Sequence, residues 1–246
     1  MRYTSDELFH FVGCGHPHDH EGNYDILKTI LIDRCISHPP HERGWGVERL
    51  TLNPAESLLN GGLLVPDVVC FADIPVGALD IHVKKYGMFG LSLVRGHLVR
   101  YGDRPVMYVP VHADDGLSIY RRTLLRDIEA VFRSLQEVTR DLPPLTQRSL
   151  GRQLGSLQES AQAASTILGR AFLAFIKPFD AALDDSAPEN FYMEREWRRL
   201  GNVCFEPEHV GRVLVAEAYV ARLKAECPAF ERKVESIDAT IAHVRG

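Results

Sequence analysis

The sequence predicts an α+β fold: a mixed or antiparallel sheet core, split by a helical insertion and followed by C-terminal helices. Short apolar and aromatic segments alternate with glycine- and proline-rich turns in the first half of the chain. A block of helical sequence follows over residues 117–185, and further strand-like and helical segments come after it. Because strands and helices come in runs, we expect α+β rather than an alternating βαβ fold.

The strand signals of the first half are short apolar runs that end at glycine, proline or polar residues. Residues 24–35, YDILKTILIDRC, instead place apolar side chains at helical spacing. Residues 76–87, VGALDIHVKKYG, predict a short helix that Gly87 ends. The expected strands are 7–12, 68–75, 88–94 and 104–111, and residues 38–66 are expected to be mostly loop.

The second half begins with a clear amphipathic helix at 116–142, which the Pro143–Pro144 pair ends. A long helical region is expected over 150–183, with a break near Pro178. We expect one domain over 1–246, within which residues 117–185 form an insertion or a subdomain. The last expected elements are strands at 191–203 and 209–220 and helices at 218–227 and 228–244.

Length and composition are those of a globular protein with a substantial core. The chain has 246 residues, of which 45% are hydrophobic and 25% charged. Its formal net charge of -5 does not favour a broad nucleic-acid-binding surface, although a local basic groove stays open.

The five cysteines are scattered and form no CxxC motif, which is typical of reduced thiols in a cytosolic protein. Cys35, Cys70 and Cys204 lie in apolar runs and are expected to be buried. The N-terminus has no apolar stretch of signal-peptide length, and no window approaches the roughly 20 apolar residues of a membrane span. We therefore expect a cytoplasmic protein without a membrane partner.

Residues 191–200, FYMEREWRRL, hold two glutamates two positions apart. A helix here would present an exposed face of mixed charge. As a strand, which the continuation GNVCF favours, alternation would put Tyr192, Glu194, Glu196 and Arg198 on one face. Neighbouring carboxylates can hold a ribose hydroxyl, activate a nucleophile or stabilise positive charge developing on a sugar.

Three more residues of the first half are candidates for a site. His10 lies in an expected strand, on the face opposite its two phenylalanine neighbours. It is either a core histidine or a donor to a ligand at the floor of a cleft. His82 and Tyr86 are four apart and share a helix face, so they either pack on the core or line a pocket toward which Asp73 points.

The loop GCGHPHDHEGN has residue types that suit zinc, but such histidines are usually solvated at the surface. No GxGxxG, Walker A, HExxH or GxSxG motif occurs. A metal-dependent nuclease is therefore the least favoured interpretation. The loop's candidate ligands are Cys14, His16, His18 and His20, and the nuclease would use His16, His18, Asp19 or His20 with Asp73.

Five segments resemble, in order and spacing, the AbiGi-type family of abortive phage-resistance proteins. They are LFHFVG, ILKTIL, VVCFADIPVGALDIHVKKYGMFGLSLVRGHL, RPVMYV and FYMEREWRRLGN. The most specific part is CFADIP…H…YGMFGLSL, from Cys70 to Leu93. The family is described as the antitoxin-like partner of an abortive-infection pair. The resemblance thus implies a role in phage defence, with a cognate toxin or a phage component as partner.

The layout also resembles ADP-ribosyltransferase-like folds of the DarT type, which open with a histidine-bearing strand and place a catalytic glutamate on a late strand. This resemblance implies NAD as cofactor. His10 would hold the ribose and Glu196 would stabilise charge developing on the sugar. Glu194 would orient a nucleic-acid or protein acceptor. The sequence departs from that pattern after the histidine, which is followed by Phe and Val rather than by Gly or Thr.

The same resemblance implies aromatic and cationic contacts to the dinucleotide, with Tyr86 or Tyr192 stacking on nicotinamide and Arg198 or Arg95 contacting the diphosphate. The expected cofactor-binding residues are His10, Asp73, His82, Tyr86, Arg95, Tyr192 and Arg198.

The competing interpretation is a non-enzymatic antitoxin or phage-sensing module, in which EREWR is a buried salt-bridge network. The enzyme requires His10, Glu194 and Glu196 to converge on one open cleft. The module predicts that they lie apart or are sealed in the core. In either case the C-terminal helices could pair two chains into a homodimer.

Overall fold

The computed structural model describes residues 5–38, 49–112, 118–140, 148–184, 187 and 190–245. It confirms the α+β class, with a mixed sheet and helices in separate runs. Chain contacts divide the protein into two units. Unit 1 comprises residues 1–48, 67–106 and 184–246, and unit 2 comprises 49–66 and 107–183.

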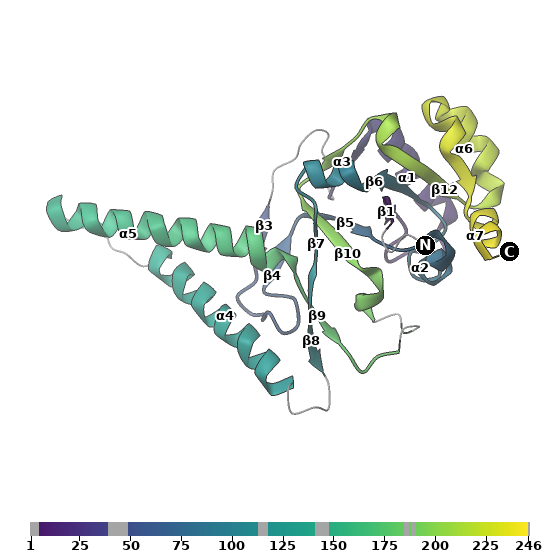
Figure 1. Cartoon of the computed structure of the whole chain (residues 1–246). Coiled ribbons are helices and arrows are strands. Elements are labelled where there is room, and N and C mark those ends of the chain that lie inside the picture. Colours follow the sequence, from purple (N-terminus) through teal and green to yellow (C-terminus); the bar gives the residue numbers. More distant parts are fainter. Residues whose placement is uncertain are drawn as a thin grey trace. The chain divides into compact units, whose positions relative to one another are not determined.

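Unit 1 is built on a seven-stranded sheet with the order β13-β12-β6-β1-β5-β10-β7 (Figure 1). Neighbouring strands are antiparallel except β12 and β13, which are parallel. The sheet therefore joins strands from the beginning and the end of the chain. The strands are β1 (Glu7–Phe11), β5 (Val68–Ala72), β6 (Gly90–Val94), β7 (Arg104–Pro105), β10 (Glu196–Leu200), β12 (Val210–Val215) and β13 (Val234–Ser236).

The two faces of this sheet bury different clusters. On one face Leu8 and Phe71 pack with Leu27 of α1 (His20–Asp33), and we call it the α1 face. On the other, Phe9 packs with Leu79 of α2 (Leu79–Tyr86), and we call it the α2 face. Alternation along each strand sends successive side chains to these two faces, as predicted for the histidine and phenylalanines of β1.

The ends of α1 and α2 follow local sequence signals. The Asp19 side chain caps α1 by accepting from the backbone N–H of Gly22. Arg34 ends α1 in a left-handed conformation, with φ 52°. Gly87 ends α2, as predicted, at φ 82°, and a Cβ there would lie 2.7 Å from the carbonyl oxygen of Pro17. Only glycine combines this φ with that close approach.

Short elements connect the main strands of unit 1. β2 (Cys35–Ile36) pairs with β11 (Val203–Cys204) outside the large sheet. The connecting helices are η1 (Val76–Ala78), α3 (Arg95–Arg100), η4 (Phe191–Glu194), η5 (Pro207–His209), η6 (Glu217–Tyr219), α6 (Val220–Glu226), η7 (Pro228–Lys233) and α7 (Ile237–Arg245).

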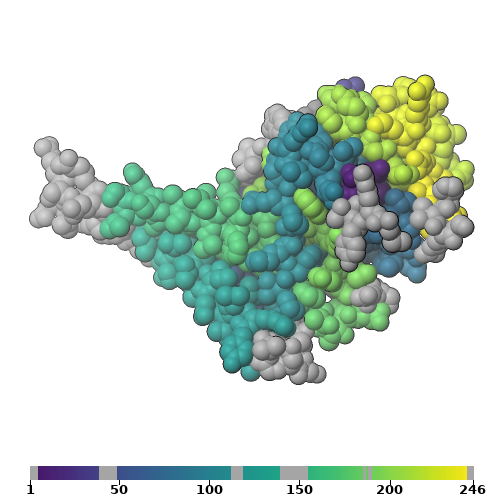
Figure 2. Space-filling model, in the orientation of Figure 1, coloured from purple at the N-terminus to yellow at the C-terminus, as the bar shows by residue number. Residues whose placement is uncertain are grey.

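Unit 2 joins two small strand pairs to a helical hairpin. β3 (Leu50–Leu52) pairs with β4 (Leu64–Pro66), and β8 (Met107–His112) runs parallel to β9 (Ile176–Asp180). The hairpin consists of α4 (Ser118–Arg140) and α5 (Arg148–Ile167), whose side chains meet along the hairpin in the space-filling view (Figure 2). α5 continues into η2 (Leu168–Phe172) and η3 (Leu173–Phe175). The hydrophobic core of unit 2 includes Leu58, Leu63, Val111, Leu125, Phe132 and Leu173.

Several predicted elements need correction. The long helix ends at Ile167, and the segment around Pro178 is strand β9 rather than a broken helix. Proline is tolerated there because, among the described strands, β9 pairs with β8 alone and has an edge whose N–H groups need no strand partner. The predicted loop 38–66 contains β3 and β4, and the predicted helix 228–244 contains strand β13. The single-domain organisation and the boundaries of the insertion remain predictions.

None of the helices in the described ranges combines the length and the hydropathy that a membrane span requires.

Candidate functional site

The register of the sheet places Glu196 on the α2 face. Phe9 lies opposite Ala72, and Ala72 lies opposite Glu196, so the three side chains form one row across β1, β5 and β10. Arg198 follows two residues later on the same face, directly opposite Cys70. We define the α2-face cluster as Phe11, His82, Lys85, Tyr86, Glu194, Glu196 and Arg198.

Glu196 and Arg198 form an ion pair along β10. The Nε atom of Arg198 donates to Oε1 of Glu196 at 2.6 Å. Glu196 is 4% exposed, so its charge is almost wholly removed from water. A buried carboxylate is tolerated only when its charge is balanced, and Arg198 supplies that balance.

Glu194 reaches the same cluster from η4 and not from a strand. Asn190 caps this turn by accepting from Tyr192 N, and Arg195 ends it in a left-handed conformation at φ 45°. The prediction of one continuous strand over 191–203 is therefore wrong for its first residues. The left-handed residue redirects the chain between the two glutamates, so Glu194 and Glu196 are placed by different backbone geometries.

Two side chains of α2 bind Glu194. The Nζ atom of Lys85 donates to its Oε1 at 2.6 Å, and the hydroxyl of Tyr86 donates to the same oxygen. Burial, and then the nearby Glu194 carboxylate, raise the pKa of Tyr86 far above its ordinary value, so the hydroxyl stays protonated as a donor. Lys85 also lies over the ring of Phe191, 4.2 Å from its centroid. Glu194 thus sits in a cationic and aromatic setting.

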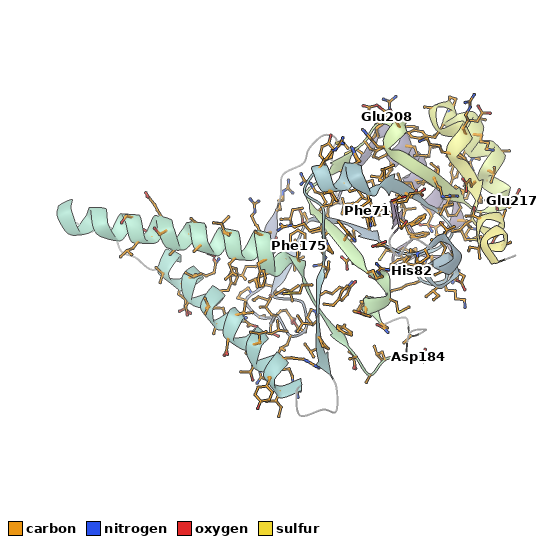
Figure 3. All side chains as sticks on the ribbon, in the orientation of Figure 1. Phe71, His82, Phe175, Asp184, Glu208 and Glu217 are labelled. Atoms are coloured by element: carbon orange, nitrogen blue, oxygen red, sulfur yellow. The ribbon has the colours of Figure 1, made fainter. Side chains whose placement is uncertain are left out.

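His82 is the unusual member of the cluster. It is 4% exposed, and among the described residues neither ring nitrogen has a hydrogen-bond partner. Its ring lies 6.0 Å from that of Tyr86 and 6.2 Å from that of Phe11, between centroids. Burial lowers its pKa, with Glu194 acting in the opposite sense. Figure 3 marks its position on α2. Buried polar groups are normally satisfied, so an unsatisfied imidazole points to a missing partner.

Solvent reaches this face next to the ion pair. Cys70 lies between Phe11 of β1 and Arg198 of β10 in strand order, and it is exposed. The prediction that Cys70 is buried is therefore wrong. The α2 face is sealed by apolar packing around Phe9 and accessible around Cys70.

His10 lies on the other side of the sheet. Its neighbours Phe9 and Phe11 point to the α2 face, and its ring lies 5.8 Å from that of Phe71, in the α1-face core. The β1–β5 ladder has a single pair, Phe9 with Ala72. Next to this pair, Nδ1 of His10 forms a hydrogen bond with the carbonyl oxygen of Cys70 at 2.9 Å. Burial lowers the pKa of His10. The structure does not bring His10 to the two glutamates, so the convergence of these three residues that the enzyme interpretation requires is not found, and on this point the arrangement is the one that the module predicts.

The remaining candidates are dispersed. Asp73 is buried and accepts from Nη2 of Arg195 at 3.2 Å, so it fixes the left-handed turn. Tyr192 is exposed on η4. Arg95 begins α3, directly after β6. In the histidine loop, His20 begins α1, and no group of three or more His, Cys, Asp or Glu in the described ranges is arranged to hold a metal ion.

Residues 65–229 match the family described as "Putative abortive phage resistance protein AbiGi, antitoxin". The chain belongs to the AbiGi family. The match covers α2, η4 and β10, and therefore every member of the α2-face cluster except Phe11. No curated protein and no solved structure shows significant similarity to the chain.

The sequence analysis identified most members of the α2-face cluster but not Lys85 and Phe11. It also did not predict that Cys70 is exposed. Lys85 was detectable in principle, because positions 82, 85 and 86 have the i, i+3, i+4 spacing of one helix face. Nothing local in the sequence indicates that Lys85 binds Glu194, which is 109 residues away.

Proposed function

We propose that this AbiGi-family protein acts in abortive-infection phage defence through an NAD-binding, ADP-ribosyltransferase-like site at the α2-face cluster. The observation that carries the proposal is the buried imidazole of His82, unsatisfied among the described residues and close to Glu194 and Tyr86. A ligand hydroxyl is the kind of group that would satisfy it.

The side chains of the cluster suit the parts of a dinucleotide. His82 would contact a ribose hydroxyl, a role that the resemblance to DarT-type folds implied for His10. Because His10 lies on the α1 face, it would not contact the ligand. It would influence the site only by helping to position strand β5. Tyr86 or Tyr192 would stack on the nicotinamide ring, and Arg198 would contact the diphosphate. Arg95 and Asp73 keep their proposed cofactor contacts only if the bound ligand extends to α3 and to the Arg195 turn.

Glu196 and Glu194 would divide the chemistry. Bound NAD would supply an ADP-ribosyl group, whose bond to nicotinamide breaks while the bonding electrons leave with nicotinamide. The Glu196 carboxylate would stabilise the positive charge that develops on the sugar. Glu194 would orient the acceptor and take its proton. Arg198 and Lys85 form ion pairs with these carboxylates, and each would exchange part of its ion pair for ligand contacts.

Calorimetry of NAD binding tests the proposal. We expect micromolar binding to the wild type and at least about tenfold weaker binding to Glu196→Gln, because a charged hydrogen bond is lost. His82→Phe should weaken binding similarly without removing a charge. Glu226→Gln is the matched control, since Glu226 is an ion-paired glutamate on α6, outside the cluster.

The absence of binding to the wild type at millimolar NAD would exclude this site. Binding that Glu196→Gln and His82→Phe leave unchanged would place the nucleotide elsewhere on the protein.

A second candidate function is an antitoxin-like interaction module, which the family description suggests. The observation that favours it is an apolar stripe on α4, formed by four large, exposed side chains at helical spacings of four and seven. Apolar stripes of this kind are typical of helix faces that bind another protein. The stripe consists of Tyr120, Leu124, Val131 and Val138.

The stripe can be tested by exchanging Leu124 and Val131 for glutamate and measuring co-purification with the cognate toxin. A charge in an apolar interface should reduce binding by at least about a hundredfold. Ala130→Glu, at an exposed α4 position outside the stripe, is the control. Equal recovery of the toxin with all variants would exclude this face as the contact.

A further inference from the structure

Two cysteines from distant parts of the chain face each other in unit 1. β2 and β11 pair antiparallel, with Cys204 directly opposite Cys35. The two Sγ atoms are 3.3 Å apart, although 169 positions separate the residues in the sequence. All five cysteines lie in the described ranges and all are reduced thiols.

The type of strand pair favours a bond between these sulfur atoms. Phe205 N donates to Arg34 O at 2.9 Å, which makes the adjacent pair a hydrogen-bonded one. Because pair types alternate along an antiparallel ladder, Cys35 and Cys204 form a non-hydrogen-bonded pair, with a typical Cα separation of about 4.5 Å. Disulfides accept Cα separations of roughly 4.4–6.8 Å. Side-chain rotation can therefore bring the sulfur atoms to the bonding distance of about 2.05 Å with little movement of the backbone.

The surroundings hold this ladder in register. Arg34 and Glu206, which flank the two cysteines, form an ion pair. Nε2 of His97 bonds the carbonyl oxygen of Cys204 at 3.2 Å, and the His97 ring stacks on that of His209. The thiols are consequently held close to each other by contacts that do not involve their sulfur atoms.

The two thiols differ in access. Cys35 is buried and Cys204 is partly exposed. A reagent in solution can therefore reach Cys204 first, while Cys35 is placed to attack the product. This asymmetry is the arrangement of an attacking and a resolving thiol.

We propose that Cys35 and Cys204 are a redox modification site that forms an intramolecular disulfide by exchange with small-molecule disulfides of the glutathione class. The Cys204 thiolate attacks one sulfur of the reagent, forming a mixed disulfide and releasing one thiolate. The Cys35 thiolate then attacks Sγ of Cys204 and releases the second thiolate. Two protein thiols are oxidised, one reagent disulfide is reduced to two thiols, and the two protons pass to the released thiolates.

The new bond would join the end of α1 to the strand that follows β10. It closes a loop of more than a hundred residues, which restricts the unfolded chain. In a reducing cytosol the pair is open, so oxidation changes the stability of unit 1 only under oxidative conditions. The site is independent of the proposed NAD chemistry.

The test equilibrates the full chain in glutathione buffers from fully reduced to fully oxidised. The samples are quenched with acid, alkylated and digested, and the peptides are identified by mass spectrometry. We expect a peptide that joins Cys35 to Cys204, a chain two hydrogen masses lighter, and a Tm increase of about 5 °C or more. The proposal is overturned if both cysteines stay alkylated in the most oxidising buffer, or if Cys204 stops at the mixed disulfide.

Cys204→Ser and Cys204→Ala should each lose both the joined peptide and the Tm increase. The matched control is Cys14→Ser, which changes an exposed thiol and should keep both. The peptide measurement on the wild type needs no variant, so it decides the proposal even if a substitution impairs folding.

Discussion

Arg198 and Arg199 are consecutive in β10 and lie on opposite faces of the sheet. They differ in whether they hydrogen-bond the buried carboxyl group beside them. On the α2 face, Arg198 donates to Glu196 at 2.6 Å. On the α1 face, Arg199 lies near Asp103, which is 3% exposed and has neither carboxylate oxygen hydrogen-bonded among the described residues. Arg199 instead donates to the carbonyl oxygen of Tyr101.

The difference appears in the protonation of the Asp103 carboxyl. Burial raises the pKa of Asp103 from its ordinary value of 3.8 to about 7, and the charge of Arg199 only partly opposes this. An arginine stabilises a buried carboxylate by direct hydrogen bonding far more than by proximity. The α2 face thus holds an ion pair, whereas the Asp103 carboxyl beside Arg199 keeps its proton until the pH approaches about 7.

The largest expected effect comes from breaking the pair on the α2 face. Arg198→Met leaves Glu196 buried without its main cation, and we expect the free energy of unfolding to fall by about 3 kcal/mol. Urea denaturation at pH 7 measures it. Glu196→Gln in the same chain should recover part of the loss, because the buried charge is then gone. A loss below about 1 kcal/mol would show that the pair contributes little.

A stabilising effect is expected on the α1 face. Below pH 3.8, the pKa of Asp103 in the unfolded chain, the carboxyl is protonated in both states and its ionisation does not lower the free energy of unfolding. Between pH 3.8 and about 7 the unfolded chain ionises more readily than the folded protein, so the free energy of unfolding falls. Above about pH 7 this loss is complete. Asp103→Asn should therefore raise the free energy of unfolding by about 2 kcal/mol at pH 8 and much less at pH 4. Urea midpoints across this range give the answer. Equal changes at both pH values would contradict a raised pKa.

A smaller and opposite pH dependence is expected from His82. Burial lowers its pKa below 6.5 in the folded state, so its stability contribution is present above pH 6.5 and is lost as the pH falls. His82→Leu should therefore reduce the loss of stability between pH 6.5 and 5 by about 1 kcal/mol. His10 also has a lowered pKa, so the wild-type slope should not vanish. If the free energy of unfolding falls equally with pH in the wild type and in His82→Leu, burial does not lower the pKa of His82.

The smallest effect is expected at an exposed pair. Arg34 and Glu206 form an ion pair in which both side chains are about half exposed to solvent. Glu206→Gln should lower the free energy of unfolding by about 0.5 kcal/mol, and less in high salt. Thermal unfolding at two salt concentrations measures it. An effect as large as that of Arg198→Met would remove the distinction between buried and exposed pairs.

The parts of the fold that sequence reasoning recovered are those with local signals. The strand at 7–12 and the helix ended by Gly87 follow from short apolar runs and from a glycine that can adopt positive φ. Sequence reasoning missed β9 because β9 contains Pro178, and proline usually interrupts strands. In addition, the partner strand β8 lies far from β9 in the sequence. Strand pairing at long range leaves no local trace.

The candidate site divides in the same way. The spacing of His82 and Tyr86 placed both on one helix face, as found. The predicted alternation held for Glu196 and Arg198, but Glu194 is on a turn, because Arg195 adopts a left-handed conformation that is uncommon outside glycine. Local alternation also gave the correct side for His10 relative to its neighbours. It could not show that the glutamates belong to the other face, since that depends on the register between β1, β5 and β10.

The four passages of the chain between its two units affect the order in which the protein can fold during translation. Residues 49–66 and 107–183 contain all of unit 2, whereas β6 in the middle of the large sheet gains its neighbour β12 only after residue 215 has been made. The strands made first, β6, β1 and β5, therefore have both outer edges unpaired until β10 and β12 have been made. Unit 2 has all of its residues during this interval. A chain truncated after residue 190 should consequently be protected from proteases within 118–140 and 148–183 and cleaved readily within 5–38.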